Sequence, residues 1–199
     1  MPHNTCFTAR VTTPGRPRDP RVDEALRRVV RDLLVGEGYA ALTVQGVART
    51  AGVSPATVYR RFPGKRELVE WAVFPAWEWV EPRWSGDYAK DLTTLVGVLL
   101  GWLFQPPIRA AVPGLLGEYV RDSSRYEALL ASTVEPVRRS LAELVRDAVA
   151  RGEAVEGVSL PALLDVLLGA VLLEAMVHDG TGLRDAAARI AEVVRRATT

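Results

Sequence analysis

The stretch Thr43–Arg66 reads TVQGVARTAGVSPATVYRRFPGKR and predicts two short helices joined by a tight turn. Thr43 is placed to cap the first helix, because its hydroxyl can accept a hydrogen bond from a free N–H in the first turn. Gly52 supplies the left-handed conformation that ends this helix. Ser54 caps the second helix, and Pro55 stands in its first turn, where a missing N–H costs nothing. The stretch therefore predicts a helix-turn-helix pair.

The second of these helices is predicted to have two chemically different faces. Val58 and Phe62 recur at helical spacing and point inward with Val53. The outer positions carry groups that can bond phosphates and base edges, namely Ala56, Thr57, Tyr59, Arg60 and Arg61. A hairpin buried in a core is the alternative, but such a hairpin would carry leucine at these outer positions. The pattern favours contact with DNA.

Charge is divided unevenly along the chain. Residues 10–66 hold twelve Lys and Arg against five Asp and Glu, a net charge of +7. Residues 67–199 hold thirteen against nineteen, a net charge of −6. A basic N-terminal third can neutralise DNA phosphates, whereas the acidic remainder should face away from the duplex. Solubility alone is the alternative reason for such an asymmetry.

The N-terminal third resembles the DNA-binding domain of TetR-family transcriptional regulators. The resemblance rests on several short motifs at consistent spacing: GRPR at 15–18, GEGY at 36–39, LTV at 42–44, VA at 47–48, AGVS at 51–54, TVYRRFP at 57–63 and KREL at 65–68. Two positions depart from the pattern, since Gly46 replaces a capping-box glutamate and Ala56 stands where glycine is common. The rest of the chain is similar to the family only in its length and helical character.

The sequence as a whole predicts an all-α protein in three segments. These are a flexible basic arm at 1–18, a three-helix helix-turn-helix DNA-binding domain at 19–66, and a helical ligand-binding and dimerisation domain at 67–199. Apolar periodicity, caps and prolines predict further helices from about Gly64, over 87–104, 108–121, 125–151, 160–177 and 183–197, with Pro113 and Pro136 expected to bend two of them.

The DNA contacts are predicted residue by residue. We expect Ala56, Thr57 and Arg60 to meet base edges. We expect Thr43, Ser54, Tyr59 and Lys65 to hold phosphates, and Arg16 and Arg18 to reach the minor groove. The resulting hypothesis is a repressor released from a palindromic operator by a small hydrophobic ligand. An activating or ligand-independent DNA-binding protein, or a helical enzyme, is the alternative.

Aromatic residues are the best indication of where such a ligand would bind. The predicted lining is Trp71, Phe74, Trp77, Trp102, Phe104, Tyr119, Met176 and His178. Aromatic walls with a few polar tips suit a flat or apolar organic molecule, either aromatic or cationic. An ordinary core rich in tryptophan is the alternative interpretation of the same residues.

The segment Leu160–Val177 is apolar on nearly every side. Asp165 and Glu174 argue against a membrane span. A helix of this kind must be covered on more than one face, so we expect it to form a homodimer interface with the helix after Leu183, as the family resemblance also implies. The predicted interface residues are Leu164, Leu168, Leu172, Ala186, Ile190 and Val194. A monomer whose core ends with these helices is the alternative.

Groups that carry out chemistry are few in this sequence. The chain has two histidines, one cysteine and no phosphate-binding glycine loop, so we expect no metal, cofactor or enzymatic activity. Cys6 has no partner for a disulfide, and the first twenty residues lack the apolar run of an export signal. We therefore expect a cytoplasmic protein.

Overall fold

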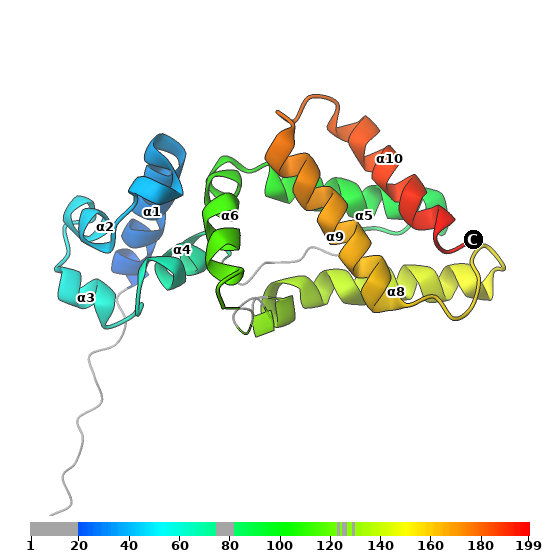
Figure 1. The fold of residues 1–199 in the computed structure, drawn as a ribbon, viewed down its shortest axis with the longest axis horizontal. Helices are drawn as coiled ribbons and strands as arrows, with labels where there is room; N and C mark the ends of the chain where they lie inside the picture. The colour runs from blue at the N-terminus through cyan, green and yellow to red at the C-terminus, as the bar shows by residue number, and fades with distance from the viewer. Residues whose placement is uncertain (1–19, 75–81, 123, 125–126, 129) are drawn as a thin grey trace, which may run out of the picture.

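The computed structural model describes residues 20–74, 82–122, 124, 127–128 and 130–199. Every regular element in these ranges is a helix, which confirms the predicted all-α class (Figure 1). The elements are α1 Pro20–Ala41, α2 Val44–Thr50, α3 Pro55–Tyr59, α4 Lys65–Val73, α5 Tyr88–Leu103, α6 Pro106–Tyr119, the π-helical turn η1 Leu130–Val134, α8 Glu135–Ala150, α9 Leu160–Val177 and α10 Leu183–Arg196.

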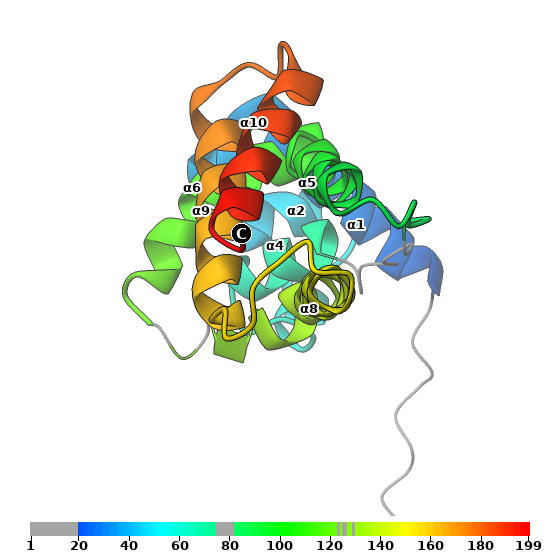
Figure 2. The ribbon, with the colours of Figure 1, turned by 90° about the vertical axis from the view of Figure 1, so that its right-hand side faces the viewer.

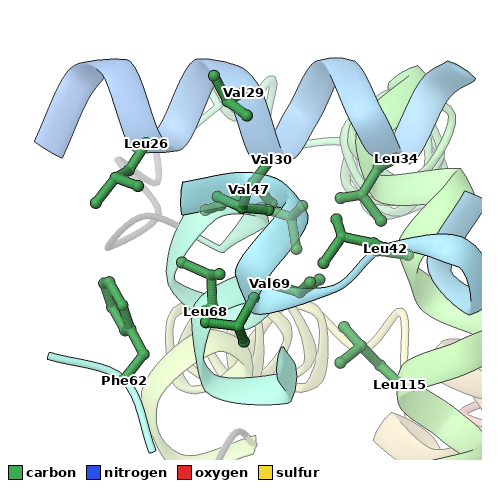
Figure 3. Packing of buried hydrophobic residues seen from close by; sticks show 14 of the residues in the cluster. Leu26, Val29, Val30, Leu34, Leu42, Val47, Phe62, Leu68, Val69 and Leu115 are labelled. Atoms are coloured by element: carbon green, nitrogen blue, oxygen red, sulfur yellow. The ribbon is translucent and has the colours of Figure 1, made fainter. Parts of the chain in front are cut away.

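The first four helices form one small core. Apolar side chains from one face of α1 meet those of α2 and α4, as the close-up of Leu26, Val30, Val47, Leu68 and Val69 shows (Figure 3). Because the buried residues of α4 belong to this cluster, the domain boundary that the sequence predicts after residue 66 cuts through it.

The C-terminal helices form a second core in which α5 is central. α5 packs along α10 and also contacts α8 and α9 (Figure 2). Three of the four buried residues of α10 are alanines, and such small side chains allow α10 to lie close to α5.

α6 stands between the two halves and contacts both (Figure 1). Leu115 on this helix joins the N-terminal core, and Pro106 begins the helix in its first turn. α6 continues through Pro113, whose side chain is exposed.

The described residues of the predicted long helix over 125–151 are helical up to Ala150, but the helix contains a π-helical turn. Residues 127–128 are α-helical, η1 follows at Leu130–Val134, and α8 begins at Glu135 with Pro136 in its first turn. Proline is tolerated there because the first N–H groups of a helix have no partner within the helix. The prediction for 160–177 agrees with α9 at both ends.

Candidate DNA-binding surface, ligand cavity and subunit interface

The turn between α2 and α3 has the capping bonds that the sequence predicts. The Thr43 hydroxyl accepts a hydrogen bond from the Gly46 N–H at 3.0 Å, and the Ser54 hydroxyl accepts one from the Thr57 N–H at 3.2 Å. Gly52 has a φ of 68°, the left-handed value that lets the chain turn. Ser54 and Thr57 also share a hydroxyl–hydroxyl bond of 2.9 Å.

The outer surface of α3 is polar and accessible. Ala56, Tyr59 and Arg60 are exposed, and Thr57 is partly exposed, whereas Val58 is fully buried. The Tyr59 hydroxyl accepts a hydrogen bond from Gln45 Nε2 at 3.1 Å. This bond fixes the phenol between the two helices. Gln45 was not among the predicted contacts, since its exposed amide on α2 has no distinctive spacing.

Arg61, just after α3, differs from these outer residues. Its guanidinium forms an ion pair with Asp23 of α1 and is largely covered. The sequence prediction placed Arg61 on the outer, DNA-facing side, and this is wrong. The residue lies just after α3, where the chain turns back toward α1, so its long side chain reaches across to that helix.

Lys65 is already engaged within the protein. Its ammonium group donates a hydrogen bond to the Ala40 carbonyl at 3.2 Å and lies 4.2 Å from the centre of the Tyr39 ring. Burial lowers the pKa of this ammonium group. The predicted phosphate contact of Lys65 therefore has to compete with these partners. Arg16 and Arg18 lie outside the described residues.

A cavity lies between the two halves of the molecule. Its volume is about 120 Å³, and it is lined by the C-terminal end of α4 together with α5, α6, η1, α8 and α9. Three predicted residues lie on its wall, Phe74, Trp102 and Tyr119, and the Phe74 and Trp102 ring centres are 5.6 Å apart. The remaining lining is mostly aliphatic: Leu99, Leu103, Val112, Leu115, Leu116, Thr133, Val134, Val137, Leu168, Val171 and Leu172.

Four predicted ligand contacts are placed elsewhere. Trp71 packs on Phe62 in the N-terminal core, with ring centres 4.8 Å apart, because it lies one turn earlier on α4 than Phe74. Phe104 follows Trp102 by two residues, so it points to the other side of α5 and lies against Arg109. Met176 and His178 are exposed at the end of α9.

Trp77 lies outside the described residues. The aliphatic lining of the cavity was not predicted, because the sequence pattern of aliphatic residues is the same whether they surround a cavity or fill a core.

α9 leaves an apolar stripe uncovered. Val166, Leu173, Met176 and Val177 are exposed, and Leu173 retains 62 % of its accessible surface. Their spacing places them on one side of the helix. Val193 of α10 is also exposed. By length and composition α9 could cross a membrane, as many core and interface helices could.

The predicted interface residues do not lie on this stripe. Ala186 and Val194 are 1 % and 0 % exposed in the core formed with α5, so they have no surface to offer a second subunit. Leu164, Leu168 and Leu172 are partly buried and turn inward, two of them onto the cavity, and Ile190 packs on the C-terminal core. Burial therefore excludes Ala186 and Val194 from a subunit interface, whereas an interface through the other four residues stays a prediction. Because α9 is apolar on every side, its sequence does not distinguish the inner face from the outer one.

Comparison with known proteins gives the family. Residues 28–72 match the family described as bacterial regulatory proteins, tetR family, and residues 83–196 match the tetracyclin repressor-like C-terminal domain. The chain belongs to the TetR family. It is a DNA-binding transcriptional regulator of the helix-turn-helix type.

Relatives of this TetR-family regulator span most of its length. The HTH-type transcriptional regulator Rv1556 of Mycobacterium tuberculosis is 30 % identical over 182 residues, which is 91 % of this chain and 88 % of that protein. Among solved structures, the fatty acid degradation regulator FadR of Bacillus halodurans has a TM-score of 0.65 at 16 % identity, covering 90 % of this chain and 96 % of that one. A TetR-family regulator of Mesorhizobium loti has a TM-score of 0.62 at 20 % identity, covering 90 % and 97 %.

Proposed function

We propose that this TetR-family regulator is a cytoplasmic homodimeric repressor that leaves a palindromic operator when a small neutral apolar molecule fills the cavity. The observation that carries the proposal is the position of the cavity: Phe74, at the end of α4, and Tyr119, at the end of α6, share its wall. A ligand placed there contacts Phe74, which follows the last helix of the DNA-binding half, and α6, the helix that joins the two halves.

The DNA contacts follow from the exposed surface of α2 and α3. Ala56, Thr57 and Arg60 meet base edges in the major groove, since they lie on the outer surface of α3. Thr43, Ser54 and Tyr59 contact phosphates from the two helix starts and the α2–α3 junction. Lys65 adds a phosphate contact when its ammonium group leaves the Ala40 carbonyl, and Arg16 and Arg18 enter the minor groove.

A second subunit covers the exposed stripe of α9. Four apolar side chains on one helix and Val193 on the next would otherwise stay in water, and two-fold symmetry lets the same stripe cover itself. A dimer in turn presents two α3 helices, and this matches an operator with two half-sites.

The cavity wall specifies the charge of the ligand. None of the described residues that line it is charged, so a cation or a carboxylate would lose its hydration without gaining an opposite charge. An apolar cavity of roughly 150 Å³ in another protein holds benzene, and about 120 Å³ here therefore suits a single small ring. Of the aromatic and cationic ligands expected from the sequence, the uncharged wall favours a neutral aromatic one.

Two measurements, made one after the other, test the proposal. Selection of bound fragments from genomic DNA should recover a palindromic site. Toluene, as a neutral probe, should then quench the fluorescence of Trp102 and weaken binding to that site in the same concentration range, because linkage makes the two effects reciprocal. Trp102→Phe identifies the quenched residue. Toluene that fills the cavity without changing operator affinity would contradict release by a ligand, and stronger binding would indicate a corepressor instead.

A further inference from the structure

One side chain touches both the cavity and the DNA-binding half. Tyr119, the last residue of α6, is 6 % exposed, and its side chain forms part of the cavity wall. Its hydroxyl donates a hydrogen bond of 2.7 Å to Oε1 of Glu70 on α4. The two residues are 49 positions apart in the sequence. The bond therefore links the far end of α6 directly to the helix that follows α3.

The protonated phenol is the state that makes this bond. Burial and the neighbouring Glu70 carboxylate both raise the pKa of the Tyr119 hydroxyl, so it keeps its proton at neutral pH. A hydrogen bond from a neutral donor to a carboxylate is short and strong compared with one between neutral groups. It is also directional, so a small displacement of the ring weakens it.

Glu70 moves with α4. Arg66 lies one turn earlier on the same helix, with its Nε 3.9 Å from Glu70 Oε1. The positive charge of Arg66 attracts the Glu70 carboxylate and so restricts its movement relative to α4. α4 begins only a few residues after α3 ends. A change at Glu70 is thus passed to a short helix that is directly connected to the DNA-reading surface.

The opposite end of α6 is held by the segment between α9 and α10. The Arg109 guanidinium donates hydrogen bonds to the carbonyls of His178 and Asp179, the latter at 3.3 Å, at the end of α9. It also lies 5.0 Å from the centre of the Phe104 ring. α6 is therefore fixed near its start to the α9–α10 corner and near its end to α4, with the cavity against Val112, Leu115 and Leu116 between the two points.

We infer that the Tyr119–Glu70 hydrogen bond is the contact through which occupation of the cavity changes the position of α4, and with it DNA affinity. A molecule that enters the cavity presses on the Tyr119 ring while Arg109 holds the other end of the helix. The ring turns or shifts, the hydroxyl leaves Glu70, and α4 is released from α6. Tyr119 is a positioning residue in this account, and the inference rests on the proposed release by a ligand.

Tyr119→Phe tests the bond while it keeps the ring in the cavity wall. The quantity to measure is the ratio of operator dissociation constants with and without saturating toluene. We expect a ratio of about ten for the unaltered protein, which corresponds to about 1.4 kcal/mol, and a ratio near one for the variant. Toluene should still quench Trp102, because the apolar wall is unchanged.

Tyr88→Phe is the matched control. The Tyr88 hydroxyl shares a buried bond of 2.9 Å with the Thr198 hydroxyl, far from α4 in the C-terminal core. This variant loses one buried phenol bond too, but it should keep the toluene response of the unaltered protein. A full response in Tyr119→Phe would overturn the inference, as would an equal loss in both variants.

Hydrogen exchange tests the Tyr119–Glu70 contact in the absence of a ligand. The backbone amides of α4 should exchange about tenfold faster in Tyr119→Phe than in the unaltered protein, whereas Tyr88→Phe should leave them unchanged. Unchanged exchange in α4 of Tyr119→Phe would overturn the inference even if toluene releases the operator. If toluene does not release the unaltered protein but α4 exchanges faster in the variant, the contact stands and the proposed release by this ligand class fails.

Discussion

Gly114 of α6 lies so close to Tyr39 of α1 that a β-carbon added to the glycine would be 2.1 Å from Cδ1 of the ring. The contact lies where α6 crosses the first helix, between the DNA-binding half and the rest of the chain. The absence of a side chain at this position allows the ring to lie directly on the helix backbone. A methyl group at position 114 would therefore force the Tyr39 ring or α6 to move.

Gly114→Ala should lower the free energy of unfolding by about 1–3 kcal/mol, because the new methyl group must push Tyr39 or α6 aside. Gly117 on the same helix is the matched control, since a β-carbon there meets nothing within 4 Å. Gly117→Ala should raise stability by up to about 1 kcal/mol through helix propensity. Urea unfolding of the two variants measures both effects. Equal stability of the two would show that the Gly114–Tyr39 contact relaxes without cost.

Leu173→Glu should convert the dimer to a monomer. Leu173 lies at the middle of the exposed stripe of α9, and a carboxylate there would be buried without a partner between subunits. Sedimentation velocity at several protein concentrations gives the result. Val120→Glu is the control, because Val120 is also highly exposed but lies after α6, away from the stripe. A Leu173→Glu dimer of normal stability would move the interface off this stripe.

Asp91→Ala should destabilise the C-terminal half by about 2–4 kcal/mol. The Asp91 carboxylate is buried and accepts hydrogen bonds from the Ser85 N–H at 2.7 Å, the Ser85 hydroxyl at 2.8 Å and the Gly86 N–H at 2.9 Å. Removing it leaves these donors without their acceptor at the start of α5. Asp87→Ala removes only the exposed cap of the same helix and should cost less. Thermal unfolding ranks the two, and the reverse order would contradict the role of Asp91.

Arg60→Ala and Thr57→Ala should affect operator binding in different ways. Loss of Arg60 removes a positive charge beside the duplex as well as a base-edge contact, so it should reduce the salt slope of binding by about 1. Loss of the Thr57 hydroxyl should instead change the relative affinity for operators altered at one base pair. Arg146 on α8 is exposed far from α3 and serves as the charge control. Isotherms at several salt concentrations distinguish these cases, and a slope that falls equally for Arg146→Ala would point to a general charge effect.

The helices of the DNA-binding half were largely predictable from interactions between residues that are close together in the sequence. Thr43 and Ser54 cap their helices through N–H groups three residues away, and Gly52 ends α2 through its own backbone conformation. These interactions act within a single turn of the chain, so the order of residues is enough to predict them. The ends of α9 were predictable for the same reason, since a proline in the first turn and a break in the apolar run mark them.

The cavity, the interface and the link between them were decided by the tertiary structure. α9 is apolar on all sides, so only its packing against the C-terminal core shows that Leu168 faces the cavity and Leu173 faces outward. Tyr119 and Glu70 meet across 49 residues because α6 stands beside α4. Periodicity states which residues share a helix face, but which neighbour that face meets depends on how helices distant in the sequence pack together.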